Sequence, residues 1–281
     1  MLGYHIIKEE KTTYEESLDI AISKEVPTGQ IFVAGPHSMK LLQIEVEEYK
    51  QKLEDSDTIL FAHNAYVCSP WNGSKKSIDF IKTQLDRCHE LGLFGLVVHL
   101  PKNDIKSVMD TLQTIQHDNT MIYLEIPSVK PDPNKSWETP ERINLLCREI
   151  RKLKLQHKFK ICVDTAHLFA SGYDISTKEQ AEEWLSSIKY PKMIGLIHLN
   201  ESAVKLGNGR DVHAEIGHGL IWGDLKDKNK VKKSGLLPFL NFAIKHEVPM
   251  ILERGGIGTS HIDRELDLVN YWIRKLNKGK N

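Results

Sequence analysis

Cysteine is scarce in this sequence, and its placement indicates neither a disulfide framework nor a thiolate metal site. The chain has 281 residues and four cysteines, Cys68, Cys88, Cys147 and Cys162, with no CxxC pair among them. Isolated cysteines of this kind are typical of free thiols in a reducing compartment. We therefore expect an intracellular protein of the cytoplasm or nucleus, or of a virion if the source is a virus.

Long hydrophobic runs are absent as well. A membrane-spanning helix needs roughly 18 consecutive apolar residues. One of the longest apolar runs, Gly92–Leu100, is much shorter and contains a histidine. The first residues, MLGYHIIKEE, lack the basic segment and the apolar stretch of a secretory signal. We expect neither membrane association nor secretion.

An excess of charge of one sign is missing too, because 38 basic side chains balance 38 acidic ones. Nucleic-acid binders usually have a basic balance, so the overall charge gives that class no support, although it leaves room for a local basic rim. With 40% hydrophobic and 27% charged residues, the composition is that of a soluble globular protein and argues against disorder or a fibre. A chain of this length can bury a large core without disulfides.

What the chain does have is a regular alternation of short apolar runs and helical patterns. The predicted strands are Leu2–Ile7, Gln30–Ala34, Thr58–His63, Gly95–His99, Met121–Glu125, Phe159–Asp164, Met193–Leu199 and Pro249–Glu253. The predicted helices are Glu15–Lys24, Leu41–Leu53, Ser77–Leu91, Ile105–Ile115, Pro140–Leu153, Lys178–Ile188, Leu236–His246 and Arg264–Leu276. Two connections, Glu125–Thr139 and Asn200–Gly235, are unusually long, as functional loops often are.

Eight strand–helix units predict an α/β fold, the (β/α)8 or TIM barrel, as a single domain over residues 1–281. Apolar runs such as Leu96–Val98 and Ile194–Ile197 are continuous, as expected for parallel strands that are buried on both faces. In such barrels the active site lies at the C-terminal ends of the strands. The residues at those ends are therefore the first candidates for function.

Six neighbouring predicted strands end in a histidine or a carboxylate. These residues are His63, His99, Glu125, Asp164, His198 and Glu253. A single polar residue at a strand end is usually a hydrogen-bonded cap, but six that converge would repel one another or stay unsatisfied without a cation. The pattern therefore predicts a metal site. His5 ends the first predicted strand, where it either supports the ligands or is a structural histidine.

Two short motifs in the loops add further ligands. Asp164 and His167 are three residues apart, so one helical turn after the strand can direct both inward. Asp211 and His213 would share a face of an extended segment. The nine candidate ligands are His63, His99, Glu125, Asp164, His167, His198, Asp211, His213 and Glu253. Imidazole and carboxylate without thiolate suit catalytic Zn²⁺, with Mn²⁺ as a substitute, and nine ligands suit three ions rather than one.

Basic residues follow several strand ends or lie in the long loops. They are Lys75, Lys76, Lys102, Lys130, Lys205, Arg210 and Arg254. A basic loop residue is usually just solvated, but together these residues would form a rim suited to phosphate.

Around these residues the sequence resembles the endonuclease IV family of abasic-site endonucleases. The resemblance is carried by His63–Val67, Cys162–His167 with Gly172–Asp174, His198–Asn200, Gly209–Gly219 and Leu252–Glu253. All nine ligand positions of the family pattern have the expected residue type. Similarity to the compact versions encoded by large DNA viruses is carried by Ala34–Pro36, Pro70–Trp71, Gly219–Trp222 and Glu253–Arg254. Two departures, Val212 for the usual arginine and Arg254 for a common threonine, concern phosphate contacts rather than the metal site.

The resemblance implies three zinc ions. It divides the ligands into a first group of His63, His99 and Glu125, a second of Glu125 as a bridge with Asp164, His198 and Glu253, and a third of His167, Asp211 and His213. It also implies direct catalytic roles for Glu125, Glu253 and His99 and DNA contacts for Tyr66, Val67, Asn200, Lys205 and Arg210.

The activity that the resemblance implies is that of a zinc-dependent hydrolase of base excision repair. It would cleave the phosphodiester 5′ to an abasic site in duplex DNA and leave a 3′-hydroxyl, with 3′-diesterase and 3′–5′ exonuclease side activities. Zinc lowers the pKa of bound water to about 7, so that hydroxide attacks, and paired metals stabilise both oxygens of an in-line displacement. An abasic nucleotide has no base to unpair, so extruding it costs little. We expect a monomer that binds abasic duplex DNA.

Tyr66 and Val67 follow His63 closely, and two interpretations of them compete. Both side chains either pack under the loop or insert into the duplex as an apolar wedge, which compensates for lost stacking. The family resemblance favours insertion.

Two other classes of function compete for the whole chain. A sugar isomerase or epimerase of the related barrel superfamily uses one divalent metal, which Glu125, Asp164, His198 and Glu253 would satisfy. It would leave the other five candidate ligands without a purpose. A binding module that is merely stabilised by metal would be expected to close its coordination shells. Counting the metal ions separates the first two classes, with three per chain or one.

Overall fold

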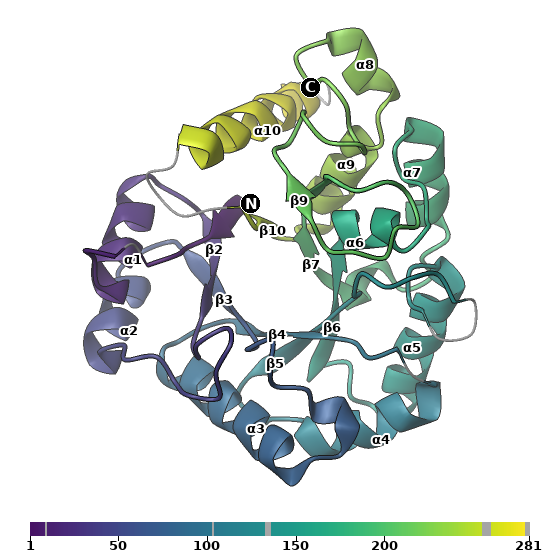
Figure 1. Cartoon of the computed structure of the whole chain (residues 1–281). Coiled ribbons are helices and arrows are strands. Elements are labelled where there is room, and N and C mark those ends of the chain that lie inside the picture. The colour runs from purple at the N-terminus through teal and green to yellow at the C-terminus, as the bar shows by residue number, and fades with distance from the viewer. Residues whose placement is uncertain (9, 103, 133–135, 255–259, 279–281) are drawn as a thin grey trace.

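The computed structural model describes residues 1–8, 10–102, 104–132, 136–254 and 260–278. Eight parallel strands form a closed barrel in the order β1-β10-β7-β6-β5-β4-β3-β2, and helices surround it as an outer ring (Figure 1). The barrel strands are β1 (Leu2–His5), β2 (Thr28–Phe32), β3 (Ile59–His63), β4 (Gly95–His99), β5 (Met121–Glu125), β6 (Phe159–Asp164), β7 (Ile194–His198) and β10 (Met250–Leu252). The predicted TIM barrel is confirmed.

The outer ring is formed by eight helices among the described residues. They are α1 (Tyr14–Ser23), α2 (Val46–Glu54), α3 (Lys75–Glu90), α4 (Ile105–Ile115), α5 (Pro140–Lys152), α7 (Lys178–Ser186), α9 (Leu236–His246) and α10 (Ser260–Lys278). Threonine side chains cap α1, α5 and α7 at Thr13, Thr139 and Thr177, which satisfies backbone N–H groups that a helix start leaves unpaired. None of the described helices is long and apolar enough to span a membrane.

Two apolar layers hold the barrel together. The larger one lies between the strands and the helices and includes the fully buried Trp137 and Trp184. The smaller one fills the barrel itself, and we call it the barrel plug. Its buried members are Phe61, Val97, Tyr123, Cys162, Leu196 and Ile251. All four cysteines are free, as predicted, and all four are buried.

The plug explains how the strands position the candidate ligands. Each plug residue lies two positions before a polar strand end, as in Phe61 and His63 or Leu196 and His198. Because side chains alternate along a strand with a period of two, a residue two positions after an inward-facing one also faces inward. The same six strands therefore carry an apolar layer and, directly above it, a layer of histidines and carboxylates.

Several element boundaries differ from the prediction. The second strand was predicted at Gln30–Ala34 but is Thr28–Phe32, because pairing with β3 runs from Thr28–Ile59 to Phe32–His63 and not along the apolar run. The helix predicted from Leu41 begins at Val46. The long connections also contain unpredicted elements: α6 (Thr165–Ala170), α8 (Lys228–Lys233) and the antiparallel pair of β8 (Glu201–Ser202) and β9 (His213–Ala214).

Candidate metal centre

Glu125 lies at the centre of the polar layer and is completely buried. Its Oε2 is 3.2 Å from Nε2 of His63 and 3.0 Å from Nε2 of His99. Its Oε1 is 3.1 Å from Nδ1 of His198 and 3.2 Å from Nδ1 of His167. Each carboxylate oxygen thus faces a different pair of imidazoles, which is the arrangement expected of a bridging ligand.

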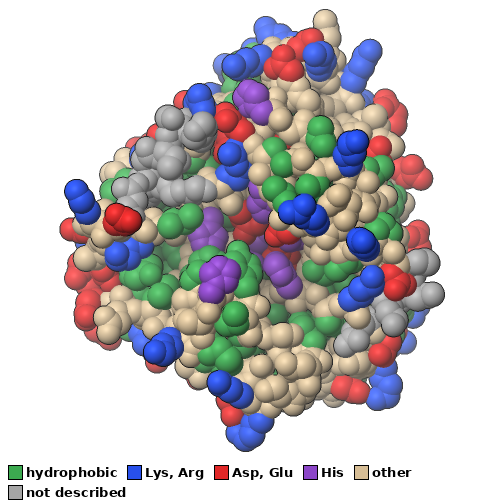
Figure 2. Space-filling model, viewed as in Figure 1, with side chains coloured by type: hydrophobic (Ala, Val, Ile, Leu, Met, Phe, Trp, Pro, Cys, Tyr) green, Lys and Arg blue, Asp and Glu red, His purple; other side chains and the backbone are tan. Residues whose placement is uncertain are grey.

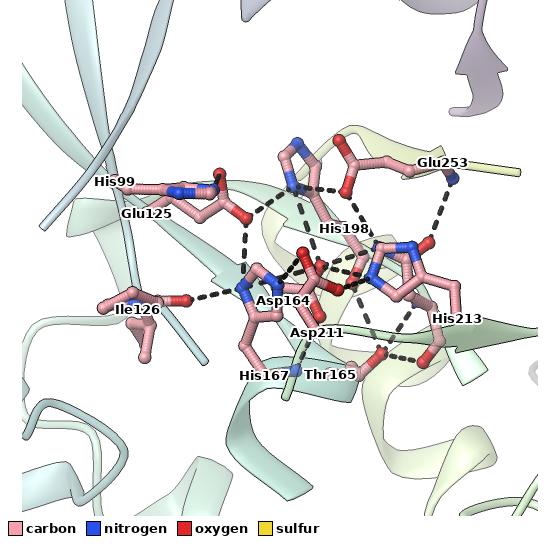
Figure 3. Close-up of polar contacts among 12 residues, drawn as sticks. His99, Glu125, Ile126, Asp164, Thr165, His167, His198, Asp211, His213 and Glu253 are labelled. Atoms are coloured by element: carbon pink, nitrogen blue, oxygen red, sulfur yellow. Dashed lines mark hydrogen bonds and ion pairs between the residues drawn. The ribbon is translucent and has the colours of Figure 1, made fainter. Parts of the chain in front are cut away.

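The candidate ligands form three groups in which the ligand atoms lie within 4.8 Å of one another. The groups are His63, His99 and Glu125; Glu125, Asp164, His198 and Glu253; and Asp164, His167 and His213. Glu125 belongs to the first two groups, as the resemblance implied, and Asp164 belongs to the last two, which it did not. Figure 3 shows the members of these groups that it labels, among them His99, Glu125 and His198, pointing toward one another.

Asp211 completes the third group from the loop that contains β9. Its two carboxylate oxygens lie 3.2 Å from Nε2 of His167 and 2.9 Å from Nε2 of His213. Both Nε2 atoms are buried, and neither makes a well-directed hydrogen bond to Asp211 or to any other described residue. Leaving a buried polar atom unpaired costs about 1–3 kcal/mol. A cation shared by these three side chains would satisfy all of them.

The strand-to-helix turn after β6 is built around Asp164. Its Oδ1 caps α6 by accepting a hydrogen bond of 2.8 Å from the backbone N–H of His167, so that Oδ2, which accepts from Asn200, is the oxygen on the side of the ligands. The Nδ1 of His167 is 2.9 Å from the carbonyl oxygen of Ile126. Because a carbonyl only accepts, Nδ1 carries the proton there and Nε2 presents a lone pair to the third group. His63 is oriented in the same way by the carbonyl oxygen of Asn64, 2.8 Å from its Nδ1.

The charge of the layer also indicates a cation. Burial raises the pKa of the Glu125 carboxyl, but the neighbouring imidazoles of His99 and His198 outweigh it and hold that pKa well below its usual range. Burial raises the pKa of Asp164, and the carboxylates of Glu253 and Glu125 add to the increase. The carboxylates of Glu125, Asp164 and Glu253 lie close together in this buried layer and repel one another. Divalent cations between them would relieve that repulsion.

A cavity of about 300 Å³ opens above this layer. Besides the candidate ligands it is lined by His5, Ile7, Phe32 and Tyr66. Figure 2 shows histidine and acidic side chains at the bottom of a hollow, with hydrophobic side chains and several lysine or arginine side chains around it. Burial lowers the pKa of His5 to about 4, so this side chain is neutral at pH 7.

Of the five residues predicted to contact DNA, four are exposed and one, Asn200, is buried. Tyr66 and Val67 are 54% and 50% exposed, and the Tyr66 ring packs edge-on against Phe32 with 5.4 Å between centroids. Lys205 and Arg210 are exposed in the loop between β8 and β9. Asn200 is buried, and its Nδ2 donates to Oδ2 of Asp164 at 2.6 Å and to Oε2 of Glu253 at 2.9 Å. A DNA contact for any of these residues stays a prediction.

Three polar or aromatic residues around the site were not predicted from the sequence. Gln30 contacts two candidate ligands, and Phe32 lines the cavity. Glu201 accepts hydrogen bonds from the backbone N–H groups of Ile221 at 2.7 Å and Trp222 at 3.0 Å, which ties down the loop that follows His213. Of the three, only Gln30 could have been noticed in the sequence, because a glutamine at the start of an otherwise apolar strand is unusual.

Comparison with known proteins agrees with this geometry. Residues 25–228 match the model of the family described as xylose isomerase-like TIM barrel. A probable AP endonuclease of African swine fever virus (isolate Warthog/Namibia/Wart80/1980) is 33% identical over 242 residues, which is 83% of this chain and 80% of that protein. A probable endonuclease 4 of Nitrosopumilus maritimus is 26% identical over 261 residues, 85% of this chain and 88% of that protein.

Solved structures give the same picture. The crystal structure of AsfvAP:AG superposes with a TM-score of 0.84 at 29% identity, covering 99% of this chain and 98% of that one. Endonuclease IV from Thermus thermophilus superposes with a TM-score of 0.76 at 21% identity, covering 98% and 99%, which shows the shared fold. From the viral relative and the family model, the chain belongs to the endonuclease IV family of abasic-site endonucleases, within the xylose isomerase-like TIM barrels.

Proposed function

We propose that this protein cleaves the DNA backbone 5′ to an abasic site in duplex DNA and leaves a 3′-hydroxyl, with the whole chain acting as one domain. The observation that carries the proposal is the set of three ligand groups joined through Glu125 and Asp164. The endonuclease names of the relatives support the same reaction. Such a site suits hydrolysis of a phosphodiester, in which negative charge develops on several oxygens at once.

The donor set fits zinc. The candidate ligands are imidazoles and carboxylates, which suit Zn²⁺ at catalytic sites and accept Mn²⁺ as a substitute. The nearest thiol, Cys162, belongs to the buried plug below the ligand layer, and burial raises its pKa to about 12. Zinc bound in such a site supplies a water-derived nucleophile at neutral pH and neutralises charge in the transition state.

The chain's own residues then bind and orient the substrate. Glu125 holds four imidazoles in place, and we assign it, with Glu253 and His99, the direct catalytic roles. Tyr66 and Val67 project from the rim, where apolar side chains can replace stacking lost in a kinked duplex. Lys205 and Arg210 would contact phosphates. The small cavity suits an extruded sugar that has no base.

A sugar isomerase or epimerase remains the natural alternative for this fold. D-psicose 3-epimerase from Clostridium cellulolyticum superposes with a TM-score of 0.61, but at 12% identity the likeness shows the fold alone. One metal held by Glu125, Asp164, His198 and Glu253 would be enough for that chemistry. The first and third ligand groups would then have no function, so the geometry favours the nuclease.

Incubation with a duplex that carries one abasic analogue tests the proposal. We expect incision 5′ to the analogue, with a 3′ end that a polymerase extends, and no incision of the same duplex with an intact base. A chelator should abolish the reaction, and added zinc should restore it. A zinc-reloaded protein that leaves the abasic duplex intact would contradict the proposal.

A further inference from the structure

The side-chain amide of Gln30 lies inside the barrel, next to the second ligand group. It makes hydrogen bonds with three side chains, those of His5, His198 and Glu253. Gln30 is in β2 and its side chain is completely buried. Its Nε2 is 2.7 Å from Oε1 of Glu253 and 3.0 Å from Nδ1 of His5. Its Oε1 is 2.9 Å from Nε2 of His198. Gln30 lies outside all three ligand groups and outside the motifs that resemble the endonuclease IV family.

The direction of each of these hydrogen bonds follows from one carboxylate. An ionised carboxylate only accepts, so the atom of Gln30 next to Glu253 must be the NH₂ group. That leaves the amide oxygen facing His198, and Nε2 of His198 must therefore carry a proton and donate it. The second amide hydrogen points to His5, whose Nδ1 must accept. The tautomers of both histidines are thus fixed through Gln30.

This network also decides which atoms remain for a metal ion. With Nε2 of His198 committed, its Nδ1 has the free lone pair, and it lies 3.1 Å from Glu125 Oε1 and 3.1 Å from Glu253 Oε2. With Oε1 of Glu253 bound to Gln30, only Oε2 of that carboxylate faces the other ligands. We propose that Gln30 is a positioning residue that presents Nδ1 of His198 and a single oxygen of Glu253 to the metal. The inference rests on the metal centre of the proposed function.

His5 supports the far side of the amide. Its ring packs against Phe32 with 4.8 Å between centroids, so Nδ1 is held where it accepts from Gln30. Without the amide, Oε1 of Glu253 and Nε2 of His198 would both lose a partner in a buried place, and the imidazole could turn its other nitrogen to the metal. Removing a group that orients ligands in this way typically weakens metal affinity 10–100-fold.

A pair of glutamine variants separates this role from ordinary packing. Gln30→Met keeps the length of the side chain and removes all three hydrogen bonds. The matched control is Gln84→Met, because Gln84 is also completely buried and bonds Asn64 Oδ1 at 2.8 Å and the N–H of Ala65 at 3.1 Å. It contacts neither His198 nor Glu253. Both variants should lower the melting temperature of the metal-free protein.

Zinc affinity, measured by competition with a chromogenic chelator, gives the decisive readout. We expect the second zinc site to weaken 10–100-fold in Gln30→Met, with a smaller zinc-induced rise in melting temperature, and to change less than about threefold in Gln84→Met. Gln30→Met with wild-type zinc affinity would overturn the inference. If the wild-type protein itself binds no zinc, the proposed function fails instead.

A structure of the zinc-loaded wild-type protein tests the same inference without any variant, and it decides the matter if Gln30→Met does not fold. Zinc on Nδ1 of His198 and on a single oxygen of Glu253, with Gln30 on the other oxygen, supports the positioning role. Zinc on Nε2 of His198, or on both oxygens of Glu253, overturns it.

Discussion

The interior of the barrel contains two adjoining layers of side chains from the same six strands: the apolar barrel plug and the polar layer of candidate ligands. The plug residues are apolar and buried, whereas the residues two positions later are histidines and carboxylates that converge on Glu125. Both layers face inward because the strand period is two. Burial of the lower layer stabilises the fold by excluding water. The upper layer gathers carboxylates that repel one another and buried imidazole nitrogens that make no hydrogen bond. We infer that stability resides in the plug and function in the ligand layer.

The largest effect should come from Glu125, which belongs to two ligand groups and contacts four imidazoles. Glu125→Gln removes one negative charge and one of two ligand oxygens, so cleavage of abasic duplex should fall at least about 10³-fold. Glu138→Gln is the matched control, because Glu138 is also a buried glutamate but bonds Ser136 outside the ligand groups. Its cleavage rate should stay within a few-fold of wild type. Near-normal activity and metal content in Glu125→Gln would show that the carboxylate does not bridge.

Two residues on β3 test the division of roles directly. Phe61→Ala removes a plug aromatic ring and should lower the free energy of unfolding of the metal-free protein by about 3–5 kcal/mol. His63→Ala, two positions on, should cost much less in the metal-free protein but should lose metal. Urea denaturation of chelator-treated protein measures both. An equal loss of stability in the two variants would contradict the separation of the layers.

A smaller effect is expected at the third ligand group. Asp211→Ala removes the carboxylate that pairs with His167 and His213. We expect the loss of about one metal ion per chain and a fall in cleavage on the order of 100-fold. Asp224→Ala alters an exposed aspartate farther along the same long connection and should change neither quantity. Full metal content in Asp211→Ala would remove this residue from the site.

The smallest effect should arise at the rim, away from both layers. A Tyr66→Ala, Val67→Ala double variant should keep its metal and its melting temperature but bind abasic duplex roughly 10-fold more weakly, because the wedge no longer replaces lost stacking. The deficit should shrink on a duplex already gapped beside the lesion. Leu153→Ala, at an exposed apolar residue on the C-cap of α5, is the control. Equal deficits on both substrates would instead indicate packing under the loop.

The elements that could be predicted from the sequence are those marked by the alternation of apolar runs and helical patterns along the chain. Strand ends such as His99 and Asp164 are visible because an apolar run stops at a polar residue, and β4 to β6 have their predicted bounds. The position of β2 was wrong by two residues, because hydrogen-bonding register with β3 decides it rather than the apolar run.

Contacts between distant segments could not be predicted. Gln30 and Glu253 are far apart in the sequence, yet their side chains are 2.7 Å apart because β1 alone separates β2 from β10 in the barrel. The sharing of Asp164 by two ligand groups likewise depends on where α6 and β9 direct His167 and His213. Pairings of this kind arise from barrel closure, which no local pattern encodes.

Elemental analysis of the purified, zinc-reloaded protein tests the central claim most directly. The three ligand groups that share Glu125 and Asp164 predict about three zinc ions per chain, and about two in Asp211→Ala. One ion per chain, unchanged in Asp211→Ala, would contradict the account and would favour the single-metal chemistry of a sugar isomerase or epimerase.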